Sequence, residues 1–526
     1  MPDPYRWLET DLRQSAEVAA WAEAQNDVTA KYLATCPDRD KIRDRLAQLW
    51  NYERYSPPMK AGQRYAYLKN DGLQNHAVLY LLDTLDGKPQ VLLDPNAWSQ
   101  DGTVALAGLS LAEDGRYLAY GASESGSDWQ TWRVMEVGSR KVLDDTLRWL
   151  KFADAAWDKD GQGFYYPRYE EPKPGEEYRQ LNLNQKVYYH RGGTAQADDR
   201  LVYQRPDHPD WSFAAHTTDD GRYLVIEVRK ADDEHYRIVY LDLSRENSQP
   251  VELIDNFDNQ FFFVGNVDAE FYFVTDLDAP RRRLVAIDTL HPERDKWREV
   301  TPQADETLTE ATFVGDRFLA LSLKDANTHV RVFDRDGKPR GEVTLPSLGT
   351  ASGFHGRRTD RETFYSFSSY GVPPRVYRYD VTTGQSSLFA APKVPFHPDD
   401  YQVEQVFYSS KDGTRVPMFV SHKKGLKRDG SNPTLLYGYG GFGISIKPQF
   451  SASSLAWMEM GGVYAVANLR GGGEYGEDWH HAGARLNKQN VFDDFIAAAE
   501  WLIRQRYTSR EKLAIHGASN GGLLVA

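Results

Sequence analysis

A short phrase recurs along most of this sequence: an apolar strand, an Asp-Gly or similar turn, and a second strand that is often rich in tyrosine. The seven copies lie at 59–68, 111–120, 156–166, 216–225, 264–274, 313–321 and 355–367. An Asp-Gly pair between two alternating apolar runs is typical of a β-hairpin. Units of about four strands, repeated every 40–60 residues or so, predict a β-propeller. Seven units therefore predict seven blades, which we place at residues 51–392.

A row of β-sandwiches is the alternative, and the number of similar units makes it the weaker one. Propeller blades close on one another in a ring, so few strand edges remain bare. That arrangement suits a chain in which the same unit recurs seven times.

The segment before the repeats is predicted to be helical, with a break at Pro37. An apolar face runs through Val18, Trp21, Val28 and Tyr32, so we expect a packing helix without chemistry of its own. We assign residues 1–50 to the same domain as the C-terminal part of the chain.

After residue 392 the pattern changes to strands that alternate with helices. Strands are expected at 403–408, 411–420, 434–437, 462–468 and 512–515, and a helix at 490–504 capped by Asn490. Such alternation predicts an α/β sheet in residues 393–526.

The sequence Gly517-Ala-Ser-Asn-Gly521 follows the last predicted strand and precedes an apolar run. A nucleophile elbow needs this pattern, because flanking side chains would collide in the tight turn that presents the serine. Backbone N–H groups of the following helix can stabilise a developing oxyanion. Ser519 is therefore the predicted nucleophile.

A glycine-rich loop, Leu436-Tyr-Gly-Tyr-Gly-Gly-Phe-Gly443, follows another strand of the same domain. Its backbone could approach a ligand closely, and a tyrosine hydroxyl there could donate to an oxyanion. A plain turn with Tyr437 and Tyr439 packed in the core is the alternative. The residues alone favour neither interpretation.

A third loop spans Asn468–His481 and contains three consecutive glycines. We expect Arg470 and Glu474 to form an internal ion pair in this loop. His480 and His481 precede Ser519, whereas the histidine of α/β-hydrolases follows the serine, so neither is favoured as the general base.

These three loops closely resemble motifs of the prolyl oligopeptidase family of serine peptidases, and weaker similarity extends over essentially the whole chain. The resemblance implies a seven-bladed propeller that caps an α/β-hydrolase domain, which would be residues 393–526 without its C-terminal part. It implies that Ser519 is the nucleophile and that the Asn520 backbone N–H and the Tyr439 hydroxyl form the oxyanion hole. Phe442 matches an aromatic wall of the pocket for a substrate proline. The implied reaction is hydrolysis of short peptides on the carboxyl side of proline.

The family places the aspartate and histidine of its triad after the serine, but only seven residues follow Ser519 in this sequence. We therefore expect a truncated chain, with the triad Asp and His beyond Ala526. Without a base, the 526 residues alone are expected to be inactive.

Two alternatives remain at this stage. Oligopeptidase B, which cleaves after Lys or Arg, resembles the chain in architecture, but its glycine loop and its elbow differ from those at Phe442 and Asn520. Acylaminoacyl and dipeptidyl peptidases fit the loops less well. The second alternative is not an enzyme: the chain would be a propeller protein that binds a partner without catalysis.

Composition limits partners and compartment. The 63 Lys and Arg against 76 Asp and Glu leave a net charge of −13, which disfavours nucleic acid and anionic membranes as partners. The single Cys36 excludes an internal disulfide and suits a reducing compartment. We expect a cytoplasmic monomer, with a periplasmic or secreted location left open because the start could be truncated. No metal-ligand spacing or phosphate loop is visible, so no cofactor is expected.

Overall fold

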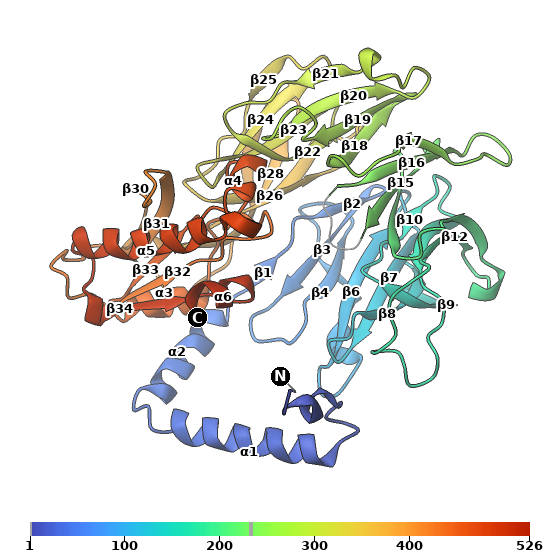
Figure 1. Cartoon of the computed structure of the whole chain (residues 1–526). Coiled ribbons are helices and arrows are strands. Elements are labelled where there is room, and N and C mark those ends of the chain that lie inside the picture. Colours follow the sequence, from blue (N-terminus) through green and yellow to red (C-terminus); the bar gives the residue numbers. More distant parts are fainter. Residues whose placement is uncertain (1–2, 231–234) are drawn as a thin grey trace.

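The computed structural model describes residues 3–230 and 235–526 and arranges them around eight sheets (Figure 1). Seven of the sheets are antiparallel and follow one another along the chain. Their strands are β1 (Arg54–Tyr55), β2 (Met59–Ala61), β3 (Arg64–Asn70), β4 (Val78–Leu82) and β5 (Gln90–Leu93); β6 (Val104–Leu111), β7 (Tyr117–Glu124), β8 (Trp129–Glu136) and β9 (Lys141–Lys151); β10 (Ala156–Trp157), β11 (Gly163–Arg168), β12 (Lys186–Arg191) and β13 (Arg200–Gln204); β14 (Trp211–Thr217), β15 (Tyr223–Lys230), β16 (Arg237–Asp242) and β17 (Val251–Ile254); β18 (Phe261–Val267), β19 (Glu270–Thr275), β20 (Arg283–Asp288) and β21 (Arg298–Thr301); β22 (Thr307–Val314), β23 (Arg317–Lys324), β24 (Asn327–Asp334) and β25 (Pro339–Glu342); and β26 (Thr350–His355), β27 (Glu362–Ser369), β28 (Val372–Asp380) and β29 (Gln385–Ala390).

These seven sheets are the blades of a β-propeller, as predicted. Each recurring phrase falls on a neighbouring pair of antiparallel strands, such as β6 with β7 or β14 with β15. In six of the blades the strand order follows the sequence without a crossover, and in the first β2 pairs with β3 beside it.

The propeller core lies between neighbouring blades and combines aliphatic with aromatic side chains. Between the fifth and sixth blades, Phe318 stacks on Phe313 with ring centroids 4.4 Å apart and meets Tyr272 edge-on at 4.9 Å. Fully burying a large apolar side chain contributes roughly 1.5–3 kcal/mol. The strong aromatic content therefore holds blades together rather than serving a site.

The eighth sheet belongs to the α/β domain and has the order β30-β31-β33-β32-β34. The strands are β30 (Tyr401–Ser409), β31 (Arg415–Lys423), β32 (Thr434–Tyr437), β33 (Val463–Ala467) and β34 (Leu513–His516). The helices are α3 (Ala452–Glu459), α4 (Glu477–His481), α5 (Gln489–Arg504) and α6 (Asn520–Val525). β32 runs parallel to both of its neighbours, as the alternating pattern predicts.

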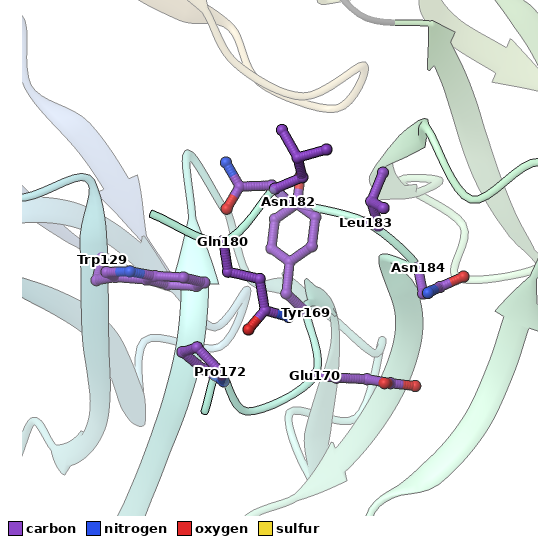
Figure 2. A pocket seen from close by; sticks show the side chains of 9 residues that line it. Trp129, Tyr169, Glu170, Pro172, Gln180, Asn182, Leu183 and Asn184 are labelled. Atoms are coloured by element: carbon purple, nitrogen blue, oxygen red, sulfur yellow. The ribbon is translucent and has the colours of Figure 1, made fainter. Parts of the chain in front are cut away.

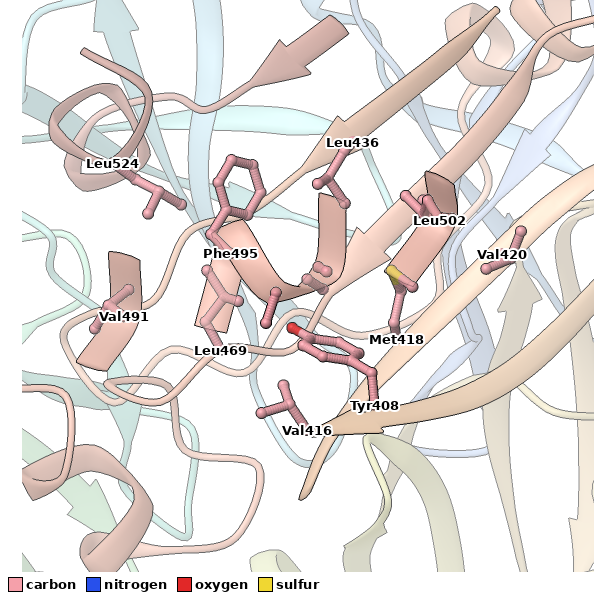
Figure 3. Close-up of a cluster of buried hydrophobic side chains, with 14 of the residues drawn as sticks. Tyr408, Val416, Met418, Val420, Leu436, Leu469, Val491, Phe495, Leu502 and Leu524 are labelled. Atoms are coloured by element: carbon pink, nitrogen blue, oxygen red, sulfur yellow. The ribbon is translucent and has the colours of Figure 1, made fainter. Parts of the chain in front are cut away.

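The core of this domain lies between the sheet and α5 (Figure 3). Val491, Phe495 and Leu502 of α5 pack on Met418 and Leu436 of the sheet. Leu524 of α6 joins the same cluster, so the short helix after Ser519 is anchored to the domain.

The two N-terminal helices are α1 (Ala16–Leu33) and α2 (Arg39–Trp50), on either side of the expected break at Pro37. Leu49 of α2 is fully buried in a cluster with Leu455 of α3, and Arg45 pairs with Glu459 at 2.7 Å. This packing ties the segment to the α/β domain. The domain limits at residues 50 and 392 stay predictions.

The expectation of a packed apolar face on α1 is wrong for most of its residues. Only Val18 of this helix is buried, whereas Trp21, Val28 and Tyr32 are exposed. In Figure 1 α1 extends below both domains, and Trp21 meets another N-terminal residue, Trp7, instead of a core.

The α/β domain docks on one face of the propeller, where the turns between β19 and β20 and between β23 and β24 contact it. The Tyr475 hydroxyl donates to Asp325 Oδ1 at 2.6 Å, and Glu477 N donates to Pro280 O at 2.8 Å. The site described next lies in this docked domain. Within the described residues, no helix is long and apolar enough to cross a membrane.

Candidate active site

Ser519 occupies the turn between β34 and α6, as its motif predicts. Its backbone has φ 54° and ψ −118°, a region that residues with a Cβ rarely adopt. The side chain is exposed, and no group in the described part of the chain hydrogen-bonds to its hydroxyl. A strained, solvent-facing serine at a strand-to-helix turn is the geometry of a nucleophile elbow.

The flanking glycines are required by close backbone approaches. A Cβ on Gly517 would lie 2.0 Å from the Gly521 carbonyl oxygen, and a Cβ on Gly521 would lie 2.7 Å from that of Gly438. Both distances are shorter than a Cβ atom can approach a carbonyl oxygen. The turn around Ser519 can therefore form only with glycine at these two positions.

The sheet brings the glycine-rich loop next to this turn. β32 and β34 are parallel neighbours with Tyr437 opposite His516, so the segments that follow them leave the sheet at the same edge. Gly438 N donates to His516 O at 3.2 Å, and Asn520 Nδ2 donates to Tyr439 O at 2.6 Å. The structure thus brings Ser519, Asn520 and Tyr439 together.

Two groups of this cluster have free donors. The Tyr439 side chain is half-buried, and its hydroxyl makes no hydrogen bond within residues 3–230 and 235–526. The backbone N–H of Asn520, at the start of α6, likewise donates to no group of those residues. A helix N-terminus and a free hydroxyl are suitable donors to a developing negative charge.

Phe442 lies on the same loop but is more peripheral. Its side chain is 61% exposed and its backbone is left-handed, with φ 55°. The ring makes no aromatic contact within the described residues. It is therefore free to form one wall of a pocket.

His480 supports the far end of the glycine loop. Its Nδ1 lies 3.0 Å from Gly443 N and 2.9 Å from Gly471 O. Neither this histidine nor His481 contacts Ser519. The ring thus serves the loop's conformation, in line with the expectation that it is not the base.

The expected ion pair between Arg470 and Glu474 does not form. Arg470 pairs instead with Asp494 of α5 and with Asp412, at 2.5 Å in each case. Asp494 is fully buried, and the guanidinium also donates to it through Nε at 2.9 Å. Asp494 thus has the cation that a buried carboxylate needs, whereas Glu474, which is also buried, has none among the described residues.

Glu474 lies buried beneath the loop, and no cation of residues 3–230 or 235–526 lies within 4.0 Å of its carboxyl. Its Oε1 accepts from Ile446 N at 2.9 Å and from Asn468 Nδ2 at 3.2 Å. Burial raises the pKa of the Glu474 carboxyl to about 7, although these hydrogen bonds oppose the rise.

This raised pKa predicts a pH-dependent stability. Between about 4.5 and about 7 the unfolded chain loses the Glu474 proton while the folded chain keeps it. The free energy of unfolding therefore falls by about 3 kcal/mol as pH rises through this window, and falls no further above it. Urea unfolding at pH 5 and pH 8 measures the loss.

Glu474→Gln should remove this part of the pH dependence, because the amide does not titrate. The matched control is Glu500→Gln, since Glu500 is exposed on α5. An unchanged difference between pH 5 and pH 8 in the Glu474→Gln variant would exclude Glu474 as its source.

A cavity of about 320 Å³ lies in the propeller (Figure 2). It is lined by Trp129 and by residues of the segment between β11 and β12, among them Tyr169 and Leu183. The Trp129 indole donates to Glu177 O at 2.7 Å and so holds this segment in place. None of the predicted site residues lines the cavity.

Comparison with known proteins decides the family. The model of the "Prolyl oligopeptidase, N-terminal beta-propeller domain" matches residues 1–392, and that of the "Prolyl oligopeptidase family" matches residues 448–526. The chain belongs to the prolyl oligopeptidase family. The predicted fold and enzyme class, a serine endopeptidase with a propeller and an α/β-hydrolase domain, are thereby confirmed.

Relatives within the family align along almost the whole chain. A prolyl endopeptidase of Elizabethkingia meningoseptica is 43% identical over 523 residues, covering 99% of this chain and 73% of its own length. A prolyl oligopeptidase of Omphalotus olearius is 36% identical and covers 99% of this chain and 74% of itself.

Solved structures of the family share the fold. One from a study of two prolyl endopeptidases and inter-domain dynamics is 39% identical, with a TM-score of 0.92 over 100% of this chain and 77% of its own. Prolyl oligopeptidase B of Galerina marginata, solved with a 35-residue hydrolysis and macrocyclization substrate, is 32% identical with a TM-score of 0.92. That match covers 100% of this chain and 76% of the Galerina protein.

Proposed function

We propose that this peptidase hydrolyses short peptides on the carboxyl side of proline, with Ser519 as its nucleophile. The observation that carries the proposal is the contact between the Ser519 turn and the glycine loop, made through Asn520 and Tyr439. The names of the relatives, which are prolyl endopeptidases and oligopeptidases, support the same specificity.

The reaction would be acyl transfer. Ser519 Oγ attacks the carbonyl carbon of the substrate proline while its proton passes to a general base. The carbonyl oxygen becomes an oxyanion, which the Asn520 N–H and the Tyr439 hydroxyl stabilise. When the tetrahedral intermediate collapses, the C–N bond breaks and the amine leaves with that proton. Water then hydrolyses the acyl-enzyme.

The described residues do not supply the general base or the acid that would orient it. No histidine among them contacts the Ser519 hydroxyl, and the seven residues after Ser519 contain neither histidine nor acid. That the triad Asp and His lie beyond Ala526 stays a prediction. The activity experiments proposed below therefore use the native protein.

Phe442 supports specificity for proline. Its exposed ring on the glycine loop offers an apolar wall, which suits the flat, uncharged pyrrolidine ring. The alternatives are not favoured: the family match supports an enzyme over a binding propeller, and the relatives are named for proline.

Two chromogenic substrates test the specificity. The native protein should hydrolyse a Gly-Pro ester far faster than the matched Arg ester. A preference for the Arg ester would overturn the proline assignment while leaving the serine mechanism intact.

Tyr439→Phe tests the oxyanion hole. The variant loses one free hydroxyl donor and little else, because that hydroxyl has no partner in the described residues. We expect kcat for the Gly-Pro substrate to fall roughly 100- to 1,000-fold with little change in KM. Steady-state kinetics measure this, with Tyr437→Phe, at the end of β32 just before the loop, as the control. A fall in Tyr439→Phe no larger than in Tyr437→Phe would contradict the role.

The propeller supports the restriction to short peptides. The loop between β26 and β27 lies at the end of the blades opposite the docked domain, where Gly315 N donates to Arg357 O. Arg357 also reaches the Glu113 carbonyl of the second blade, and Lys159 pairs with the Glu113 carboxylate at 2.8 Å. These pairs connect the second, third and seventh blades, so they narrow the opening at that end of the propeller. Efficient cleavage of a folded globular protein would contradict the restriction.

We also propose that the protein acts as a cytoplasmic monomer without nucleic acid or membrane partners. The net charge of −13 and the unpaired Cys36 support this. Light scattering of the purified protein measures its oligomeric state, and fractionation of the source cells locates it.

A further inference from the structure

Lys488 joins the two loops that carry the predicted oxyanion donors. Its Nζ donates to Gly440 O at 2.7 Å and to Asn520 Oδ1 at 3.1 Å. The other end of the same amide, Asn520 Nδ2, donates to Tyr439 O at 2.6 Å. One ammonium and one amide thus tie the start of α6 to two successive carbonyls of the glycine loop.

This lysine stands where stability alone disfavours a cation. It directly precedes α5, whose N-terminus carries a partial positive charge, and a cation there costs about 0.3–1 kcal/mol. The side chain is half-buried, and this desolvation lowers the pKa of the Lys488 ammonium. In the described part of the chain no carboxylate lies within 4.0 Å of it.

Local costs of this kind are typical of functional positions, because a structural role is normally filled by a favourable residue. A serine or aspartate before α5 would cap the helix. Neither could donate to two carbonyl-type oxygens at once, as the ammonium does. The contacts of Lys488 thus concern the two loops and not the helix.

We propose that Lys488 is a positioning residue of the catalytic site, which sets the separation between the Asn520 N–H and the Tyr439 hydroxyl. The inference rests on the proposed function of these two donors. Without Lys488 the Asn520 amide oxygen loses its only donor among the described residues, and the glycine loop loses its link at Gly440. The distance between the Asn520 N–H and the Tyr439 hydroxyl would then no longer be fixed.

Displacement of oxyanion donors acts on the transition state, because the negative charge exists only there. An error of about 1 Å in such a group can cost about 100-fold in rate. Binding of the peptide itself would change little, since neither Lys488 contact involves the predicted proline wall at Phe442.

The test compares Lys488→Met, Lys488→Arg and Lys411→Met in the native protein. Lys411 is an exposed lysine whose Nζ lies 3.8 Å from Asp493 of α5. Its substitution therefore controls for the loss of one positive charge near α5. We expect Lys488→Met to lower kcat roughly 10- to 100-fold with KM within about threefold. Lys488→Arg, which keeps charge and donors, should recover most of the loss, and Lys411→Met should change little.

Thermal melting of each variant separates positioning from folding. A Lys488→Met variant with a normal melting temperature and the kcat loss supports the inference. An unchanged kcat, an equal loss in kcat and in 1/KM, or equal losses in Lys488→Met and Lys488→Arg would overturn it. Absence of Gly-Pro hydrolysis in the unmodified protein would instead count against the proposed function. If Lys488→Met fails to fold, the Lys488→Arg and Lys411→Met pair decides: the inference then requires near-normal kcat in both.

Discussion

Ser519→Ala should lower kcat for a peptide substrate by a factor on the order of 10⁶, because loss of the nucleophile removes the acyl-enzyme route altogether. KM should stay near that of the unmodified protein, since the serine side chain is exposed and holds no structural contact in the described residues. Hydrolysis of a fluorogenic peptide amide with proline before the cleaved bond measures both constants.

The control for this variant is Ser347→Ala, at an exposed serine of the propeller. It should keep full activity. Substantial turnover by Ser519→Ala, at more than about one thousandth of the normal rate, would show that another residue performs the attack.

Arg470→Met should destabilise the α/β domain by about 3–5 kcal/mol, because it leaves the carboxylate of Asp494 buried without a cation. Asp494 is fully inaccessible to water, so solvation cannot replace the guanidinium. Burial of the new apolar side chain offsets only part of this cost. Chemical denaturation followed by tryptophan fluorescence measures the change in unfolding free energy.

Arg504→Met is the matched control, at the other end of α5, where Arg504 pairs with exposed Glu500 at 3.4 Å. An exposed pair contributes at most about 1 kcal/mol. Equal stabilities of the two variants would contradict a structural role for the Arg470–Asp494 pair. The double variant Arg470→Met with Asp494→Leu should recover stability, since it removes both buried charges together.

The propeller was predictable from sequence because its units are local. An Asp-Gly turn needs left-handed backbone conformations that few residues adopt. Each such hairpin can therefore be recognised from about ten consecutive residues. Gly115, for example, has φ 73° at such a turn. The nucleophile turn is local only in part: a Cβ on Gly517 would meet the Gly521 carbonyl four residues away, whereas a Cβ on Gly521 would meet that of Gly438 on the neighbouring loop.

Pairings between distant segments were not predictable in this way. Glu474 lies four residues from Arg470 in sequence, which suggested an ion pair, but the fold places Asp494 and Asp412 beside the guanidinium. The burial pattern of α5 contains a usable signal. Its buried face runs through Val491, Asp494, Phe495, Ala498 and Leu502, so an acid within an apolar stripe marks a buried partner.

The start of α5 also differs from the sequence-based expectation. Asn490 was expected to cap the helix, but the helix begins at Gln489, and the Asn490 amide donates to Ala482 O at 2.8 Å. Lys488 therefore takes the position before the helix. Its importance could not be seen in the sequence, because its two acceptors belong to loops 32 and 48 residues away.

Labelling of the native protein with a fluorophosphonate, followed by peptide mapping, shows directly whether Ser519 is the nucleophile. The reagent reacts with activated serines, and hydrolysis of the Gly-Pro substrate is followed in the same sample. We expect one adduct, on Ser519, formed in proportion to the loss of hydrolysis. Loss of hydrolysis with the adduct on another residue, or full labelling of Ser519 with hydrolysis retained, would contradict it.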